Sequence, residues 1–96
     1  MDMLRWLERW YESHCNGDWE HCYTNIIIKT LDNPGWSIEI NLIDTSLENK
    51  KFERIKVDNS ENDWFSCFVE KGKFRGFGDT EKLSVIIKIF KDWAEN

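Results

Sequence analysis

The sequence predicts an α+β fold: an antiparallel meander sheet of about five strands, flanked by an N-terminal and a C-terminal helix. Apolar residues recur at helical spacing near both ends of the chain, and short β-branched and aromatic stretches separated by turns lie between them. The connections are shorter than the crossovers that parallel strands need, so neighbouring strands should be antiparallel. The chain has 96 residues, which is enough for one modest core. We therefore expect a single domain over residues 1–96.

The first element is a helix in the stretch "MLRWLERWYESHC". Asp2 can cap its start, and Asn16-Gly17 is suited to end it. Trp6 lies beside the main apolar stripe. That stripe, at i, i+3 and i+4 spacing, consists of Met3, Leu4, Leu7, Trp10 and Tyr11.

Five strands should follow. "CYTNIIIKTL" is rich in β-branched residues, and "WSIEINL" alternates strictly, with Trp36, Ile38, Ile40 and Leu42 on one face. Asn33-Pro34-Gly35 between them is typical of a tight turn, so the pair predicts a hairpin. The remaining strands are expected at "FERIKVDN", "WFSCFVE" and "FRGFG", where the glycines indicate bulges or close backbone approaches.

The closing helix is expected after Asp79 or Thr80, either of which can act as its cap. Its apolar face should pack on the sheet together with that of the first helix. The residues predicted to make this contact are Leu4, Leu7, Trp10, Ile86, Ile87 and Phe90.

The net charge of −5 argues against binding nucleic acid through its phosphate backbone. The charge is unevenly distributed. Residues 1–49 hold nine acidic and three basic side chains, net −6, whereas residues 50–96 hold nine acidic and ten basic, net +1. Such asymmetry indicates a preference for basic partners.

The N-terminal residues lack a basic segment followed by an apolar one, so we expect no signal peptide and a cytoplasmic location. The longest apolar runs are far too short to span a membrane. In a reducing compartment the three cysteines should be free thiols.

"HCNGDWEHCY", residues 14–23, concentrates two His-Cys pairs around an acidic loop. Zinc could use these side chains, but ligand pairs in structural sites are usually two to four residues apart. Adjacent residues such as His21 and Cys22 point to opposite faces of a strand. We therefore expect a helix terminus, an acidic loop and a strand start, with no metal or other cofactor. Cys15 and Cys22 would be small buried side chains, and His14 would satisfy carbonyls at the helix end.

A catalytic role for this stretch is also disfavoured. A nucleophilic cysteine needs a helix N-terminus or a cationic neighbour, whereas Cys15 is expected at a helix C-terminus near Asp18 and Glu20. We predict no catalytic residue and no enzyme activity. A sulfurtransferase-like thiol enzyme using Cys15 remains an alternative.

Two loops remain as candidate recognition surfaces: "GDWE" and the turn "LDNPGW". Carboxylates in exposed turns can orient a basic protein partner and speed its association, and an aromatic side chain between them can serve as an anchor. The predicted partner-binding residues are Asp18, Trp19, Glu20 and Asp32. The acidic side chains of residues 44–63 are the next candidates.

Two motifs, "W-Y-x3-C-x-G-D-W-E-H" from Trp10 to His21 and "T-L-D-N-P-G-W" from Thr30 to Trp36, closely resemble the immunity protein 53 family of bacterial polymorphic toxin systems. The resemblance extends over roughly residues 4 to 94. Members of that family often carry Asp where this chain has Asn16. The loop of this chain therefore has one carboxylate fewer.

The resemblance implies a cytoplasmic antidote that binds a cognate toxin protein, and the charge asymmetry suggests that the toxin is basic. The resemblance implies no catalysis, while the net charge argues against contact with nucleic acid and the short apolar runs argue against contact with a membrane. One further alternative is an acidic mimic of nucleic acid, in which the first half of the chain imitates a phosphate track.

Overall fold

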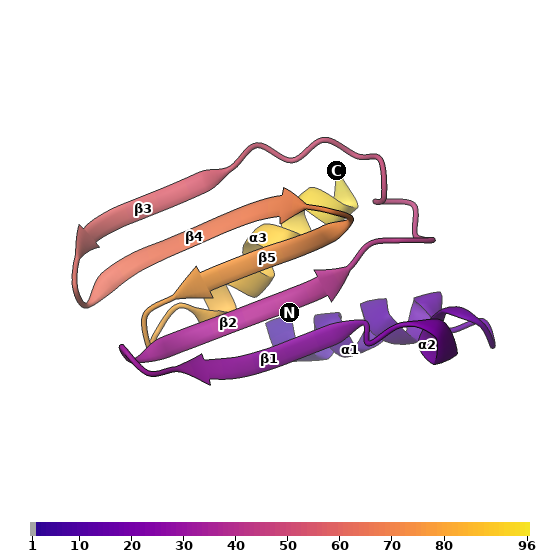
Figure 1. Ribbon diagram of the computed structural model, residues 1–96, viewed down its shortest axis with the longest axis horizontal. Coiled ribbons are helices and arrows are strands. Elements are labelled where there is room, and N and C mark those ends of the chain that lie inside the picture. The colour runs from indigo at the N-terminus through magenta and orange to yellow at the C-terminus, as the bar shows by residue number, and fades with distance from the viewer. Residues whose placement is uncertain (1) are drawn as a thin grey trace.

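The computed structural model describes residues 2–96, in which five strands form one sheet. Figure 1 shows the two long helices, α1 (Met3–His14) and α3 (Leu83–Glu95), behind this sheet. This arrangement confirms the predicted α+β class and the placing of both helices on one face. Among the described residues, no helix has the length and apolar character needed to cross a membrane. The elements are α1 (Met3–His14), α2 (Trp19–Cys22), β1 (Ile26–Leu31), β2 (Gly35–Asn41), β3 (Ile55–Ser60), β4 (Asp63–Glu70), β5 (Lys73–Gly78) and α3 (Leu83–Glu95).

All neighbouring strands are antiparallel, and their order across the sheet is β1-β2-β5-β4-β3. β1 and β2 form one hairpin, and β3, β4 and β5 form a three-stranded meander. Residues 42–54 carry the chain from β2 to the far edge, where β3 begins (Figure 1). The last strand, β5, therefore lies between β2 and β4.

The core lies between the sheet and the helices. The core face predicted for β2 is confirmed for Ile38, Ile40 and Leu42, which are buried on the side that the helices cover, whereas Trp36 is only half-buried. Phe90 of α3 lies at the centre, where edge-to-face ring contacts join it to Trp6 and Trp10 of α1. Such aromatic pairs add to the free energy gained by burying large side chains.

Close approach of α3 to the sheet explains the glycine at position 76. A Cβ atom there would overlap with the side chain of Ile86 and would lie 3.1 Å from Cγ2 of Ile38. This confirms the interpretation of the β5 glycines as sites of close packing.

One predicted helix contact is wrong. Leu4 is 55% exposed, whereas Trp6 is only 8% exposed. α1 is rotated so that Trp6 packs against α3, and its indole N–H donates to the carboxylate of Glu95 at 3.0 Å. Asp2 caps the start of α1 as predicted, since its side chain accepts from the backbone N–H of Leu4.

α3 begins at Leu83, later than predicted, and neither Asp79 nor Thr80 is its N-cap. Asp79 is buried and organises the turn before the helix instead. Its carboxylate accepts from the backbone N–H groups of Trp64 and Glu81 and from Nζ of Lys82. The side-chain bond from Lys82 is the largest cause that lowers the pKa of Asp79, to about 2.

Candidate functional site

The segment between α1 and β1 differs from the predicted loop and strand start. α1 ends at His14, Gly17 adopts a positive φ of 95°, and the short helix α2 follows. β1 begins only at Ile26, so residues 22–25 are not part of the strand. The helical turn directs Trp19 towards the core, which an extended segment would not do.

Side chains of the loop hold this shape. The two carboxylate oxygens of Glu20 accept from the backbone N–H groups of Asn16 and Gly17, at 2.9 and 2.8 Å. The pKa of Glu20 is below its ordinary value, because its own backbone N–H, and those of Gly17 and Asn16, stabilise the carboxylate. Glu20 therefore shapes the loop, in addition to any contact with a partner.

Asn16 completes the network. Its side-chain oxygen accepts from the backbone N–H groups of Asp18 and Trp19, at 3.0 and 3.1 Å. An aspartate can form the same bonds, since each side chain places an oxygen at this position. Asn16, in place of the aspartate expected from the resemblance, removes one charge from the loop and keeps an acceptor for both bonds.

Trp19 belongs to the core. It is 3% exposed, and its indole N–H donates to the backbone carbonyl of Ile43 at 3.0 Å. Its ring meets Trp10 of α1 edge to face, at a centroid separation of 5.9 Å. The bond to Ile43 joins α2 to the segment after β2. Trp19 is therefore not accessible as a surface anchor in this structure.

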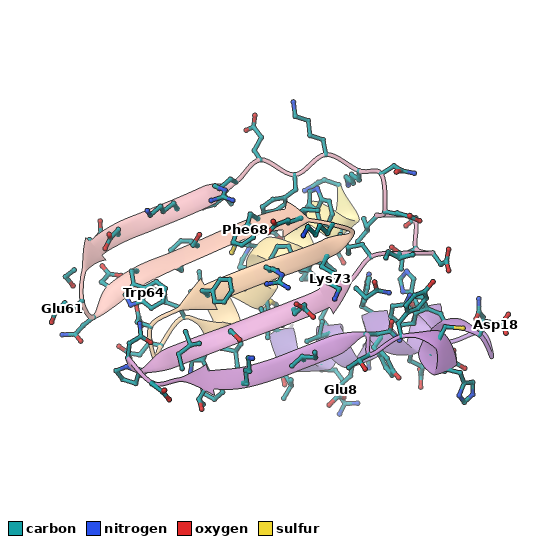
Figure 2. The ribbon with its side chains drawn as sticks, in the orientation of Figure 1. Glu8, Asp18, Glu61, Trp64, Phe68 and Lys73 are labelled. Carbon is teal, nitrogen blue, oxygen red and sulfur yellow. The ribbon has the colours of Figure 1, made fainter. Side chains whose placement is uncertain are left out.

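The predicted carboxylates do not form one surface. Asp18 is the N-cap of α2 and Glu20 lies within that helix, and Asp18 is labelled at this end of the molecule in Figure 2. Asp32 is exposed in the turn after β1, at the opposite end of that strand. Six residues of strand separate the two ends by about 20 Å.

The structure instead brings Asp44 and Glu48 to the α2 end. The hydroxyl of Tyr23 donates to the Asp44 carboxylate at 2.9 Å, and the backbone N–H of Asp44 donates to Glu48 at 3.1 Å. The hydrogen bond to Asp44 raises the pKa of Tyr23. A cavity of about 240 Å³ lies between Asp18 and Asp44. We call the carboxylates of Asp18, Glu20, Asp44 and Glu48 the acidic end.

The His-Cys pairs do not converge. Cys15 and Cys22 are exposed, so the expectation that they are buried was wrong. Cys15 follows the last turn of α1, where its thiol donates to the carbonyl of Tyr11 at 3.4 Å. His14 binds the carbonyl of Trp10 through Nδ1 at 2.8 Å, as predicted for a helix end. Within residues 2–96, no group of three or more His, Cys, Asp or Glu side chains has a geometry that could hold a metal ion.

Comparison with known proteins places these features in a family. Neither the curated proteins nor the solved structures contain a match to the chain. The family described as immunity protein 53 matches residues 4–95, which include α1 except for Met3, all five strands and α3. The chain therefore belongs to the immunity protein 53 family.

Proposed function

We propose that this protein is an immunity protein that binds a cognate polymorphic toxin effector and neutralises it by protein–protein contact. The family match over residues 4–95 is the observation that carries this proposal. In this proposal the chain acts as a single unit in the cytoplasm, where it meets the toxin, and it needs no catalysis or cofactor.

The acidic end is the proposed first contact with a basic toxin domain. Asp18, Asp44 and Glu48 are exposed there. Residues 10–49 contain a single lysine or arginine, Lys29, although Lys50 and Lys51 follow Glu48 closely. A concentration of one charge speeds the encounter with an oppositely charged protein and helps to orient it. Glu20 contributes charge while it holds the loop, whereas Asp32 lies about 20 Å away, at the other end of β1, and is not part of the acidic end.

The test uses the toxin domain encoded next to the gene for this chain, inactivated by mutation. A triple variant, Asp18→Asn, Asp44→Asn and Glu48→Gln, removes three charges and retains side chains of similar size. Glu20 is left unchanged so that the loop keeps its shape. A matched control, Asp32→Asn with Glu61→Gln, removes carboxylates from exposed turns at the other end of the sheet (Figure 2).

The triple variant should associate about tenfold more slowly at low salt, and its on-rate should depend less on ionic strength. The control should retain a rate near that of the wild type. Stopped-flow fluorescence measures both rates, and coexpression with the active toxin measures protection of cells. Absence of binding by the wild-type chain would refute the immunity function. Equal association rates for the two variants would refute only the proposal that the acidic end makes the first contact with the toxin.

A further inference from the structure

Exposed apolar side chains gather along one edge of the sheet. Leu4 and Tyr11 of α1 are 55% and 37% exposed, and Ile27 and Ile28 of β1 are each 37% exposed. The other large exposed apolar side chain in residues 2–96 is Val85 of α3. α1 runs behind β1 in Figure 1, so four of these five side chains flank the same edge strand. A cluster of exposed apolar side chains on a small protein indicates an interaction site.

The backbone of β1 is open along this edge. The N–H of Asn41 donates to the carbonyl of Asn25 at 2.8 Å, and Asn25 lies opposite Asn41 in the antiparallel register of the hairpin. Hydrogen-bonded pairs alternate along antiparallel strands. The N–H and C=O groups of Ile26, Ile28 and Thr30 therefore point away from β2 and are positioned to pair with another strand.

The two edges of the sheet differ in how they resist such pairing. β3, at the far edge, exposes Lys56 and Asp58, and its register shifts between Asp58 and Ser60. Charged side chains and irregular register are common means by which proteins prevent an edge strand from pairing. β1 has the sequence Ile-Ile-Ile-Lys-Thr-Leu and a continuous register with β2. β1 exposes one charged side chain, Lys29, and has no register shift, so its edge is less protected than that of β3.

An apolar groove lies beside this open edge, between α1 and the start of β1. It has a volume of about 400 Å³, and Leu4, Leu7, Tyr11, Tyr23 and Ile26 line it. Side chains of Ile26 and Ile28 point to the helix side of the sheet, as do Ile38 and Ile40 opposite them. Every second side chain of a strand added at this edge would point to the helix side of the sheet, where the groove lies beside the start of β1.

We propose that the edge of β1 binds an extended segment of the cognate toxin, which adds a sixth strand to the sheet. The segment places alternate apolar side chains in the groove beside α1 and carries basic residues where it passes the acidic end. This inference rests on the proposed immunity function and specifies how the toxin is held. Main-chain bonds to Ile26, Ile28 and Thr30 supply affinity, and the groove supplies selectivity for apolar side chains.

Charge favours a toxin segment over a second copy of this chain. Glu8 lines the groove, with Nε of Arg5 at 3.8 Å from its carboxylate, and Tyr23 at the end of the groove bonds to Asp44 of the acidic end. Two copies joined antiparallel through β1 would direct Asp32 of one copy towards the acidic end of the other. This dimer would bring carboxylates of the two copies together, which is unfavourable, whereas the same carboxylates would attract a basic segment of the toxin.

Proline at position 30 tests the main-chain contact. Thr30→Pro removes an N–H that points outward, so the hydrogen bonds between β1 and β2 are retained. Thr30→Ala is the matched control, because it removes the same side chain and keeps the N–H. The inactivated toxin domain is the probe, and calorimetry measures its affinity. Thr30→Pro should weaken binding about tenfold or more relative to Thr30→Ala, since a partner carbonyl loses its donor.

A second pair of variants tests the groove. Leu4→Ser should weaken binding about tenfold, whereas Val85→Ser, which removes an exposed apolar side chain from α3, should leave it unchanged. Hydrogen exchange on the wild-type complex provides a test without mutation, because the amides of Ile26, Ile28 and Thr30 should become protected when the toxin is bound.

Equal affinities for Thr30→Pro and Thr30→Ala, together with unprotected amides at these three positions, would overturn the proposed strand addition while leaving the immunity function standing. If the wild type fails to bind the toxin, both proposals fall. Analytical ultracentrifugation of the free protein shows whether a second copy of the chain occupies the edge of β1 instead. A dimer that Thr30→Pro converts to monomer would assign the edge to a second copy and overturn the proposal.

Discussion

Replacement of Gly76 by alanine should test how closely α3 approaches the sheet. The added Cβ would overlap with Cγ2 of Ile86 and would lie 3.1 Å from Cγ2 of Ile38. Because Ile38 and Ile86 are almost completely buried, neither can move aside into solvent. The variant must therefore shift α3 or force a side chain out of its preferred rotamer.

The magnitude follows from two opposing effects. Overpacking of a core typically costs 1–3 kcal/mol, roughly, while replacing a strand glycine by alanine recovers about 0.5–1 kcal/mol of chain entropy. Gly76→Ala should therefore lower the free energy of unfolding by about 1–2 kcal/mol. Ile86→Ala alone should cost about 2–5 kcal/mol, since it leaves a cavity at a fully buried site.

The double variant distinguishes a local clash from general disruption of the strand. With alanine at both positions, the Cβ at position 76 would lie 3.5 Å from the Cβ at position 86, which is an ordinary contact. The new methyl group then fills part of the space that Ile86 vacated. The double variant should be about as stable as Ile86→Ala alone, so the coupling energy should equal the cost of Gly76→Ala, about 1–2 kcal/mol in its favour.

Urea unfolding followed by tryptophan fluorescence gives the required free energies, provided that the m-values agree among the variants. Gly76→Ala combined with Leu7→Ala is the control, because Leu7 is buried but is not among the nearest atoms to the added Cβ. That pair should be additive within about 0.5 kcal/mol. A neutral Gly76→Ala variant, or equal coupling in both pairs, would refute the reasoning.

Two further predictions concern titratable groups of the core. The pKa of Asp79 is lowered to about 2, so the stability that it contributes is present above the unfolded pKa of about 3.9 and is lost as the pH falls towards 2. The free energy of unfolding should therefore decline more steeply on acidification in the wild type than in Asp79→Asn, as acid titration of urea unfolding can show; parallel curves would contradict this. Burial raises the pKa of the Cys67 thiol to about 12, so a disulfide reagent should modify Cys15 and Cys22 in the native protein and Cys67 only on unfolding. Mass spectrometry counts the modified thiols, and rapid modification of native Cys67 would show this assignment to be wrong.

Periodicity predicted the elements whose burial follows a simple repeat. β2 alternates strictly, and Ile38, Ile40 and Leu42 all reach the core. For α1 the repeat did not distinguish the correct face, because stripes that include Leu4 or Trp6 are nearly equivalent in sequence. Contact with α3, which is distant in sequence, selects Trp6, and its bond to Glu95 lies outside any local window.

The candidate site was predicted only in part, since its shape depends on specific hydrogen bonds. Two bonds to Glu20 and two to Asn16 fold residues 15–22 into a turn and a four-residue helix, which is too short to show a repeat. These bonds bury Trp19, although its acidic neighbours suggested an exposed loop. Asp44 reaches the same end through Tyr23, and no local pattern links residues 23 and 44.

The strand order has a consequence for how the protein is made. β5 pairs with β2 on one side and with β4 on the other, so it is the central strand of the sheet although it is the last to be synthesised. Until residues 73–78 leave the ribosome, the β1–β2 hairpin and the β3–β4 hairpin have no strand to join them. Isolated two-stranded hairpins are at best marginally stable in water. Folding must therefore wait for nearly the whole chain, and nascent chains expose both hairpins to chaperones and proteases until β5 inserts between them.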